Sequence, residues 1–227
     1  MLDQDVLGYV RESLPSAPVR VLEVGAGSGE LAAALTDLGY DVVAIDPAST
    51  GDTVRPIPLH ELPGPLESFD AAVAVVSLHH IEPLRESCRR LAEVVGPGGT
   101  LVLDEIDAAV FDERAARWWV EHRDAGGHEP GGHEPGGREP GGHEPGDHEP
   151  GTPEEIVAFL RHHIHDLATL QDTLGEWFEL GPPVRGPYLY RWELPPGLRA
   201  TEVQDIATGR LPAVGVRIVG ARRPGPA

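Results

Sequence analysis

The chain has 227 residues, a net charge of −19 and a hydrophobic content of 40%, which fit one α/β domain with added segments. All 18 basic residues are arginine, and so acidic a surface repels phosphates, which disfavours DNA and RNA as substrates. The single cysteine, Cys88, excludes an internal disulfide and indicates a reducing cytoplasm. We expect no membrane span and no signal peptide, because no segment reaches ~18 apolar residues and the first residues are acidic.

Residues 2–14 carry an apolar stripe that predicts an amphipathic helix. Leu2, Val6, Val10 and Leu14 recur at helical spacing, and Pro15 should end the helix. Such a stripe is typical of a helix that packs on a core.

Residues 19–46 predict half of a nucleotide-binding α/β unit. The apolar run over 19–24 predicts a buried parallel strand, and a helix over 30–38 and a second strand over 42–45 follow it. Between the first strand and the helix lie three glycines at alternate positions, Gly25, Gly27 and Gly29. A turn without Cβ atoms lets backbone N–H groups approach a ligand. Asp46, at the tip of the second strand, is placed to accept hydrogen bonds from ribose hydroxyls.

The glycine spacing separates two cofactor classes. Dinucleotide sites favour G-x-G-x-x-G, whereas this chain has G-x-G-x-G with Glu23 two residues before the first glycine. An anion beside the turn is poorly suited to a pyrophosphate, so an NAD(P)-dependent oxidoreductase is the disfavoured alternative. The acid suits a ligand with an ammonium group. S-adenosylmethionine is such a ligand, with a ribose for Asp46 and an amino group for the neighbourhood of Glu23.

Three motifs resemble those of the class I S-adenosylmethionine-dependent methyltransferases. E-V-G-A-G-S-G-E-L, over residues 23–31, resembles the family's first motif. F-D, an apolar strand and S-L-H-H-I, over 69–81, resemble its fourth-strand motif. G-P-G-G-T-L-V-L, over 96–103, resembles the entrance to its fifth strand.

The resemblance implies a Rossmann-like fold with a seven-stranded, mostly parallel sheet, an antiparallel last strand and helices on both faces. The expected organisation is a cofactor-binding core over 1–105, a helical cap over 106–180 that contains a disordered repeat loop, and C-terminal strands over 181–227. The expected activity is methyl transfer to an oxygen or nitrogen of a small molecule. The composition, with arginine in place of lysine and much Ala, Gly and Pro, indicates a GC-rich bacterial genome.

The resemblance also assigns cofactor contacts. The methionine and ribose region would be held by Glu23, Gly25, Ala26, Gly27 and Gly29. Asp46 would bind the ribose hydroxyls with Pro47 beside the adenine, and Ser77 and Leu78 would touch the methionine arm.

Residues 47–68 are rich in proline, and only a short strand near 57–59 is predicted there. The family often has an acid at the end of this strand for the adenine amino group, and Pro58 stands at the matching position. Leu59 would offer its backbone and an apolar face to the adenine, with His60 or Glu61 as replacements for the acid.

The chain changes character after Ile106. A helix is predicted over 112–122 with the pair Trp118 and Trp119, which suggests either a planar small-molecule acceptor or a place in the core. Five copies of a pentapeptide of the type G-G-H-E-P, with Arg138 in the third copy and Asp147 in the last, then fill 126–150 without one hydrophobic residue, so a solvated loop is expected. The repeated histidines leave open a metal-binding or scaffolding protein on a methyltransferase fold.

Order is expected to resume at Thr152, where a capping box predicts a helix to about residue 167 with His162, His163 and His165 on it. These histidines suit a polar helix face, a base or metal ligands. A helix over 170–175, a strand over 188–194, a helix over 201–208 and a last strand over 212–219 complete the prediction.

An oxygen acceptor would need a base. His80, at the tip of the fourth strand, is the first candidate because histidine titrates near neutrality. Glu105, just past the fifth strand, is the second and would bind a substrate amine or hydroxyl, or cap a loop. No metal is expected in the catalytic step, and the sequence leaves the oligomeric state open.

Overall fold

The computed structural model describes residues 2–49, 51–125 and 152–224. It divides into two compact units. The first comprises Met1–Glu105, Ala168–Pro183 and Arg217–Ala227, and the second comprises Ile106–Leu167 and Val184–Val216. The pentapeptide repeat over 126–150 lies outside the described residues, so its loop and its metal role stay predictions, as does the cap over 106–180.

The first unit holds most of a sheet and the helices that cover it. The strands are β1 (Arg20–Val24), β2 (Asp41–Ile45), β3 (Val54–Arg55), β4 (Phe69–Val75), β5 (Val95–Ile106), β6 (Phe178–Leu180) and β8 (Gly215–Arg222). The helices are α1 (Gln4–Ser13), α2 (Glu30–Asp37), α3 (Leu84–Val94) and α6 (Leu167–Gly175), with short 3-10 turns η1 (Leu59–Glu61) and η2 (Leu78–His80).

The sheet confirms the predicted α/β class. Its strand order is β3-β2-β1-β4-β5-β8-β6, and β7 (Val184–Gly186) also pairs with β8. The pairs β1–β2, β1–β4 and β4–β5 are parallel, whereas β6 and β8 are antiparallel. The described residues thus form eight strands rather than the expected seven, because the short strands β6 and β7 both pair with β8, whereas only one strand, over 188–194, was expected before the last one. Val24 aligns with Ile45 and with Ala74, so β1, β2 and β4 end at the same edge.

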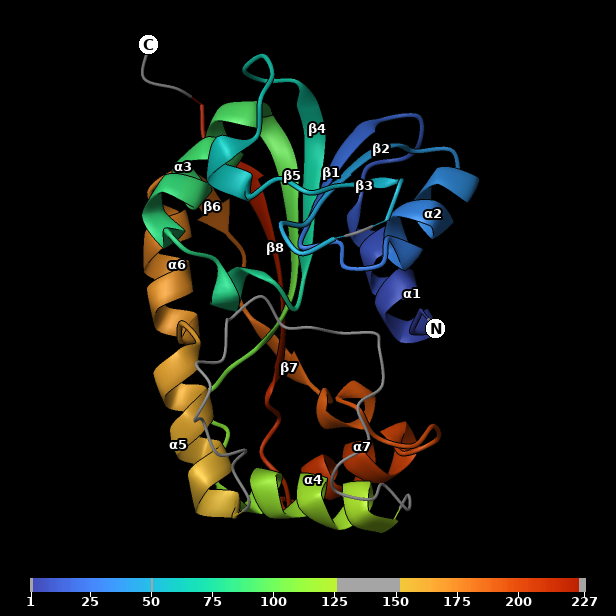
Figure 1. Ribbon diagram of the computed structural model, residues 1–227, viewed down its shortest axis with the longest axis vertical. Coiled ribbons are helices and arrows are strands. Elements are labelled where there is room, and N and C mark those ends of the chain that lie inside the picture. Colours follow the sequence, from blue (N-terminus) through green and yellow to red (C-terminus); the bar gives the residue numbers. More distant parts are fainter. Residues whose placement is uncertain (1, 50, 126–151, 225–227) are drawn as a thin grey trace. The chain divides into compact units, whose positions relative to one another are not determined.

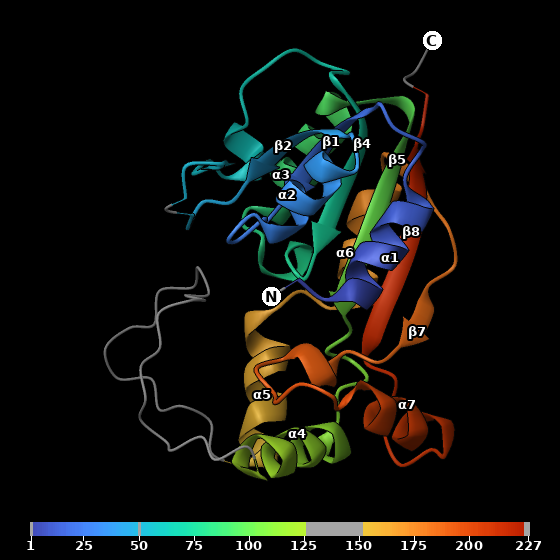
Figure 2. The ribbon, with the colours of Figure 1, turned by 90° about the vertical axis from the view of Figure 1, so that its right-hand side faces the viewer.

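Helices cover both faces of this sheet, with α1 and α2 on one face and α3 and α6 on the other (Figures 1 and 2). Val6 and Val10 of α1 pack with Leu31 and Leu35 of α2 in one buried cluster that also contains sheet residues. The apolar stripe predicted for residues 2–14 is therefore a core stripe. Asp3 caps α1 by accepting the N–H of Asp5 at 2.7 Å.

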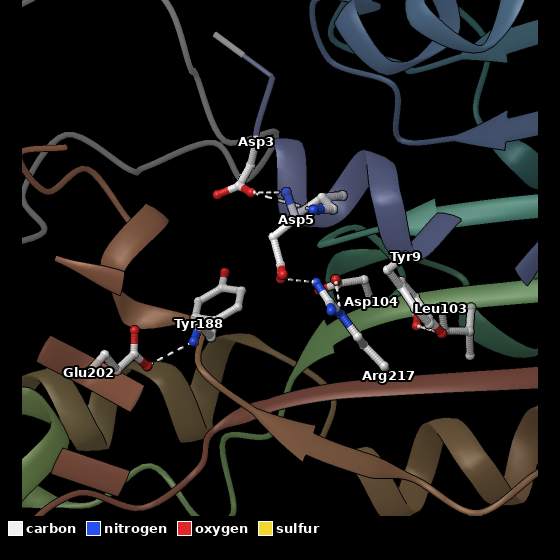
Figure 3. Close-up of polar contacts among 9 residues, drawn as sticks. Asp3, Asp5, Tyr9, Leu103, Asp104, Tyr188, Glu202 and Arg217 are labelled. Atoms are coloured by element: carbon white, nitrogen blue, oxygen red, sulfur yellow. Dashed lines mark hydrogen bonds and ion pairs between the residues drawn. The ribbon is translucent and has the colours of Figure 1, made fainter. Parts of the chain in front are cut away.

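Arg217 of β8 fixes α1 to the sheet. It donates from Nε to Asp104 at 2.9 Å and from Nη2 to Asp5 at 2.7 Å (Figure 3). The guanidinium also lies 4.5 Å from the ring centroid of Tyr9, whose hydroxyl donates to the carbonyl of Leu103 at 3.0 Å. This network ties the helix to the two strands at its back.

The second unit contains α4 (Glu113–Ala125), α5 (Pro153–His163), the 3-10 turn η3 (Leu189–Arg191) and α7 (Arg199–Ala207). Trp118 and Trp119 of α4 are each 7% exposed. Trp118 donates from its indole nitrogen to Asp205 at 2.9 Å, and Trp119 donates to the carbonyl of Trp192 at 2.8 Å. Both tryptophans therefore belong to the core of this unit and offer little surface to a ligand.

The predicted strand over 188–194 is wrong, because a buried acid bends this segment into η3. The carboxylate of Glu202 accepts the N–H group of Tyr188 at 2.7 Å (Figure 3). It also accepts the N–H groups of Leu189 at 2.9 Å and Tyr190 at 2.8 Å. These N–H groups are unavailable to a strand ladder.

Two further boundaries differ from the prediction. The strand near 57–59 is wrong, because β3 ends at Arg55 and the prolines at 56 and 58 have no N–H for a ladder. The helix from Thr152 ends at His163 rather than near 167, because Ile164 leaves the helical region with φ −127° and ψ 148°. The predicted capping box of Thr152 and Glu155 is confirmed.

Candidate active site

The glycine turn between β1 and α2 lies against the end of β2. The N–H groups of Gly25 and Ala26 donate to the carbonyl of Ile45 at 2.9 and 3.0 Å, and the N–H of Gly29 donates to the carbonyl of Ala26 at 2.8 Å. All three glycines of the motif have positive φ, at 69°, 53° and 81°, which is the left-handed region that favours glycine. The alternation of glycines is thus a conformational requirement of the turn.

Asp46 closes the turn from the tip of β2. Its Oδ2 accepts the N–H of Gly27 at 2.9 Å, and its Oδ1 accepts the N–H of Ala48 at 2.8 Å. The residue is half-buried and the following Pro47 is exposed. Each carboxylate oxygen has a second lone pair, so two hydroxyl donors can still bind.

Glu23 is an unusual buried acid in β1, with only 4% of the residue exposed. Its Oε2 is buried and has no hydrogen-bond partner in the described part of the chain. Burial raises the pKa of Glu23 to about 8, and the Asp46 carboxylate adds to the rise, against an opposing hydrogen bond from the Ala32 backbone. A buried oxygen without a partner is costly, and an ammonium donor would satisfy it.

Ser77 and Leu78 follow β4 and are buried beside the glycine turn. The Ser77 hydroxyl donates to the carbonyl of Val24 at 2.8 Å, and a Cβ added at Gly25 would lie 2.2 Å from the Cβ of Ser77. The structure therefore brings together the two segments that the sequence predicted to hold the methionine arm. Leu59, assigned to the adenine, is a buried residue at the start of η1 and not at a strand end.

The candidate acid–base residues lie in η2 and at the end of β5. Glu105 is 1% exposed and His79 is 3% exposed, and the Nδ1 of His79 lies 2.5 Å from Oε2 of Glu105. Oε1 of Glu105 accepts the N–H groups of Ser77 at 3.2 Å and Leu78 at 2.8 Å. The ring of His80, the first candidate base, is half-buried and its centroid lies 4.1 Å from that of His79.

His79 is the residue whose part in this site the sequence does not reveal. The two histidines are adjacent, and the alternation of the strand does not continue through a 3-10 turn. Which of the two points at Glu105 therefore depends on tertiary contacts.

Among the described residues, no group of three or more His, Cys, Asp and Glu side chains is arranged to hold a metal ion. His162 and His163 lie on α5 with ring centroids 5.1 Å apart, and both are exposed. Within the same described ranges, no helix is both long and apolar enough to cross a membrane.

Comparison with known proteins finds similarity to methyltransferases. A family model described as "Methyltransferase domain" matches residues 6–130. An uncharacterized methyltransferase of Mycobacterium tuberculosis is 37% identical over 100 residues, which cover 40% of this chain and 41% of that protein. A ubiquinone biosynthesis O-methyltransferase of Xanthomonas campestris is 34% identical over 120 residues, which cover 44% and 48%. The matches thus span less than half the length of these relatives.

Solved structures show the fold of the whole described chain. An S-adenosylmethionine-dependent methyltransferase of Mesorhizobium loti superposes with a TM-score of 0.57 at 16% identity, covering 96% of each chain. The 1,6-didemethyltoxoflavin-N1-methyltransferase of Burkholderia thailandensis, solved with S-adenosylhomocysteine, has a TM-score of 0.53 at 17% identity, covering 98% of this chain and 78% of that one. Because the family model spans more than half of the sequence, the chain belongs to the methyltransferase-domain family, with the class I Rossmann-like fold of the S-adenosylmethionine-dependent methyltransferases.

Proposed function

We propose that this chain binds S-adenosylmethionine and transfers its methyl group to an oxygen or nitrogen atom of a small molecule. The observation that supports this most is the buried Oε2 of Glu23, which has no partner in the described residues and lies in the strand that leads into the glycine turn. A pyrophosphate would leave this acid unpaired and would be repelled by it, whereas an ammonium group would pair with it.

The proposed cofactor contacts follow the geometry of the turn. Glu23 would receive the amino group, and the backbone from Gly25 to Gly29, including Ala26 and Gly27, would line the methionine and ribose region. Asp46 would bind the ribose hydroxyls through its remaining lone pairs.

The outer contacts belong to other loops. Pro47 and Leu59 would border the adenine, and Ser77 and Leu78 would touch the methionine arm from the end of β4. Pro58 stands where an adenine-binding acid is usual in the family, and it offers no side-chain acceptor. The adenine would therefore be contacted there mainly by the apolar face of Leu59.

When bound, S-adenosylmethionine supplies an activated sulfonium methyl group. The protein then needs mainly to orient the acceptor in line with this group and to remove a proton where the acceptor is a hydroxyl. His80 is the proposed base, because its imidazole is half-buried beside the end of β4. Glu105 is fully engaged by three donors from η2 and its entry, so it supports this turn.

The acceptor class rests on composition and on the relatives. The net charge of −19 disfavours a nucleic acid and leaves a small molecule as the preferred acceptor. The Xanthomonas relative is named for an oxygen acceptor and the Burkholderia structure for a nitrogen acceptor, so both atoms are retained. A cytoplasmic location remains the expectation from the lone, buried Cys88.

Isothermal titration calorimetry with S-adenosylhomocysteine and NADH, in parallel, tests the cofactor assignment. We expect saturable binding of S-adenosylhomocysteine and none of NADH at the same concentration. Binding of NADH alone would overturn the proposal in favour of an oxidoreductase. A screen of phenols and aromatic amines as acceptors would then use the amount of S-adenosylhomocysteine released as its readout.

A further inference from the structure

The two oxygens of Glu105 have different partners. Oε1 accepts the N–H groups of Ser77 and Leu78, and Oε2 contacts the Nδ1 of His79. The residue is 1% exposed, so bulk water does not compete for these contacts. One oxygen holds the backbone beside the glycine turn, and the other holds an imidazole.

The backbone that enters this turn is strained. Val76 has a φ of 52°, a conformation that is a genuine outlier for a β-branched residue. Its N–H donates to the carbonyl of Asp104 at 2.7 Å. Such a conformation persists only where surrounding contacts determine it, and the Oε1 bonds of Glu105 act on the next two residues.

The contact with Oε2 also fixes the hydrogen on His79. An ionised carboxylate only accepts hydrogen bonds, so beside an ionised Glu105 the Nδ1 of His79 must bear the hydrogen, and in the neutral ring Nε2 then bears the lone pair. The His79 ring packs against that of His80, with centroids 4.1 Å apart and planes at 52°. The state of His79 thus sets the surroundings of the proposed base.

We propose that Glu105 is a positioning residue with two separable tasks, one for each oxygen. Oε1 holds Ser77 and Leu78 against the glycine turn, which is the cofactor side. Oε2 fixes the tautomer and the ring of His79 behind His80, which is the acceptor side. The assignment of the two sides rests on the proposed function, whereas the tautomer of His79 does not.

Glu105→Gln separates the two tasks. The amide oxygen can still accept from the Ser77 and Leu78 N–H groups. Because these groups only donate, they orient the amide with its oxygen toward them. The amide NH₂ then faces His79, and because it is a donor, Nδ1 must become the acceptor and the hydrogen must move to Nε2. We expect the affinity for S-adenosylhomocysteine to stay within about threefold of wild type while the tautomer of His79 switches.

Two measurements follow these tasks independently. Calorimetry with S-adenosylhomocysteine reports the cofactor side. Long-range ¹H–¹⁵N spectra of protein labelled at histidine report which ring nitrogen bears the hydrogen, and the spectrum of His79→Gln assigns the signal. Neither measurement needs the methyl acceptor.

Glu105→Leu removes both tasks at similar volume. We expect its affinity for S-adenosylhomocysteine to fall by about tenfold or more, because the Ser77 and Leu78 N–H groups lose their acceptor. Should this variant not fold, Glu105→Gln alone still decides the proposal.

Glu202→Gln is the matched control, because Glu202 also holds three N–H groups at a 3-10 turn, and among the described residues its hydrogen bonds go to these N–H groups and not to a histidine. We expect this control to leave both the tautomer of His79 and the affinity for S-adenosylhomocysteine unchanged. The proposal is overturned if Glu105→Gln leaves Nδ1 protonated, or if it weakens S-adenosylhomocysteine as much as Glu105→Leu does. Failure of the wild-type protein to bind S-adenosylhomocysteine would instead reject the proposed function, and the tautomer result would stand.

Discussion

A Cβ atom added at Gly25 would lie 2.2 Å from the Cβ of Ser77, well inside the distance that two carbon atoms tolerate. The turn after β1 and the turn after β4 therefore meet only because residue 25 has no side chain. We predict that Gly25→Ala abolishes binding of S-adenosylhomocysteine in calorimetry, because Ser77 would have to move away from the cofactor side.

Gly209→Ala is the control for this prediction. Gly209 also has positive φ, at 73°, but a Cβ added there would meet nothing within 4 Å, and the residue lies outside the proposed cofactor turn. This variant should carry only the backbone strain of about 1–2 kcal/mol, seen as a lower midpoint of urea unfolding with binding retained. Equal loss of binding in both variants would mean that strain, and not the contact with Ser77, limits residue 25.

Binding should depend on pH through Glu23, whose pKa of about 8 in the free protein lies above its usual 4.5. Pairing with an ammonium group favours the ionised acid, so ligand binding releases a proton when the pH is below 8. We predict that affinity for S-adenosylhomocysteine rises on the order of tenfold between pH 6 and pH 7.5, where the ligand amino group stays charged. Glu23→Gln should bind more weakly and without this dependence.

Stability of the free protein should show the opposite trend. Because the pKa of Glu23 is raised on folding, the folded state binds more protons than the unfolded state between pH 4.5 and 8. The free energy of unfolding contributed by this group therefore falls as the pH rises through that window. Between pH 5 and pH 8, urea titrations should show a smaller fall in the free energy of unfolding for Glu23→Gln than for wild type. An identical fall in both proteins would mean that Glu23 does not cause this pH dependence.

The segments that local patterns predicted well are those whose backbone is satisfied within the element. The strand–glycine–helix–strand stretch over 19–46 was predicted nearly residue by residue, because glycine spacing and apolar runs determine it. The segment over 188–194 could not be predicted, since its turn depends on the carboxylate of Glu202 several residues later. The pairing of His79 with Glu105 is likewise a contact across 26 residues. The residues proposed to hold the cofactor therefore lie largely in a segment that local patterns predict. The surroundings of His80, the proposed base, depend instead on the long-range contact of its neighbour His79.

Substitutions of Asp46 should distinguish its part in holding the turn from its proposed part in binding the ribose. Asp46→Ala removes the acceptors for Gly27 and Ala48 as well as those proposed for ribose, and we predict weaker binding of S-adenosylhomocysteine by about 1–3 kcal/mol. Asp46→Asn keeps one acceptor oxygen and should lose less. Thermal unfolding measured in parallel shows whether the turn itself is damaged, and an unchanged affinity in both variants would place the ribose elsewhere.

His80→Ala tests the proposed base. Once an acceptor is identified, we predict a fall in turnover of about 10²-fold with the affinity for S-adenosylhomocysteine near that of wild type, because general-base catalysis acts on the acceptor and not on the cofactor. His163→Ala is the comparison, since His163 is an exposed histidine at the end of α5 whose Nδ1 contacts the Phe159 carbonyl at 2.8 Å. Loss of turnover in His163→Ala with full activity in His80→Ala would move the base to α5. Full activity in both would indicate an acceptor that reacts in its neutral form without a protein base.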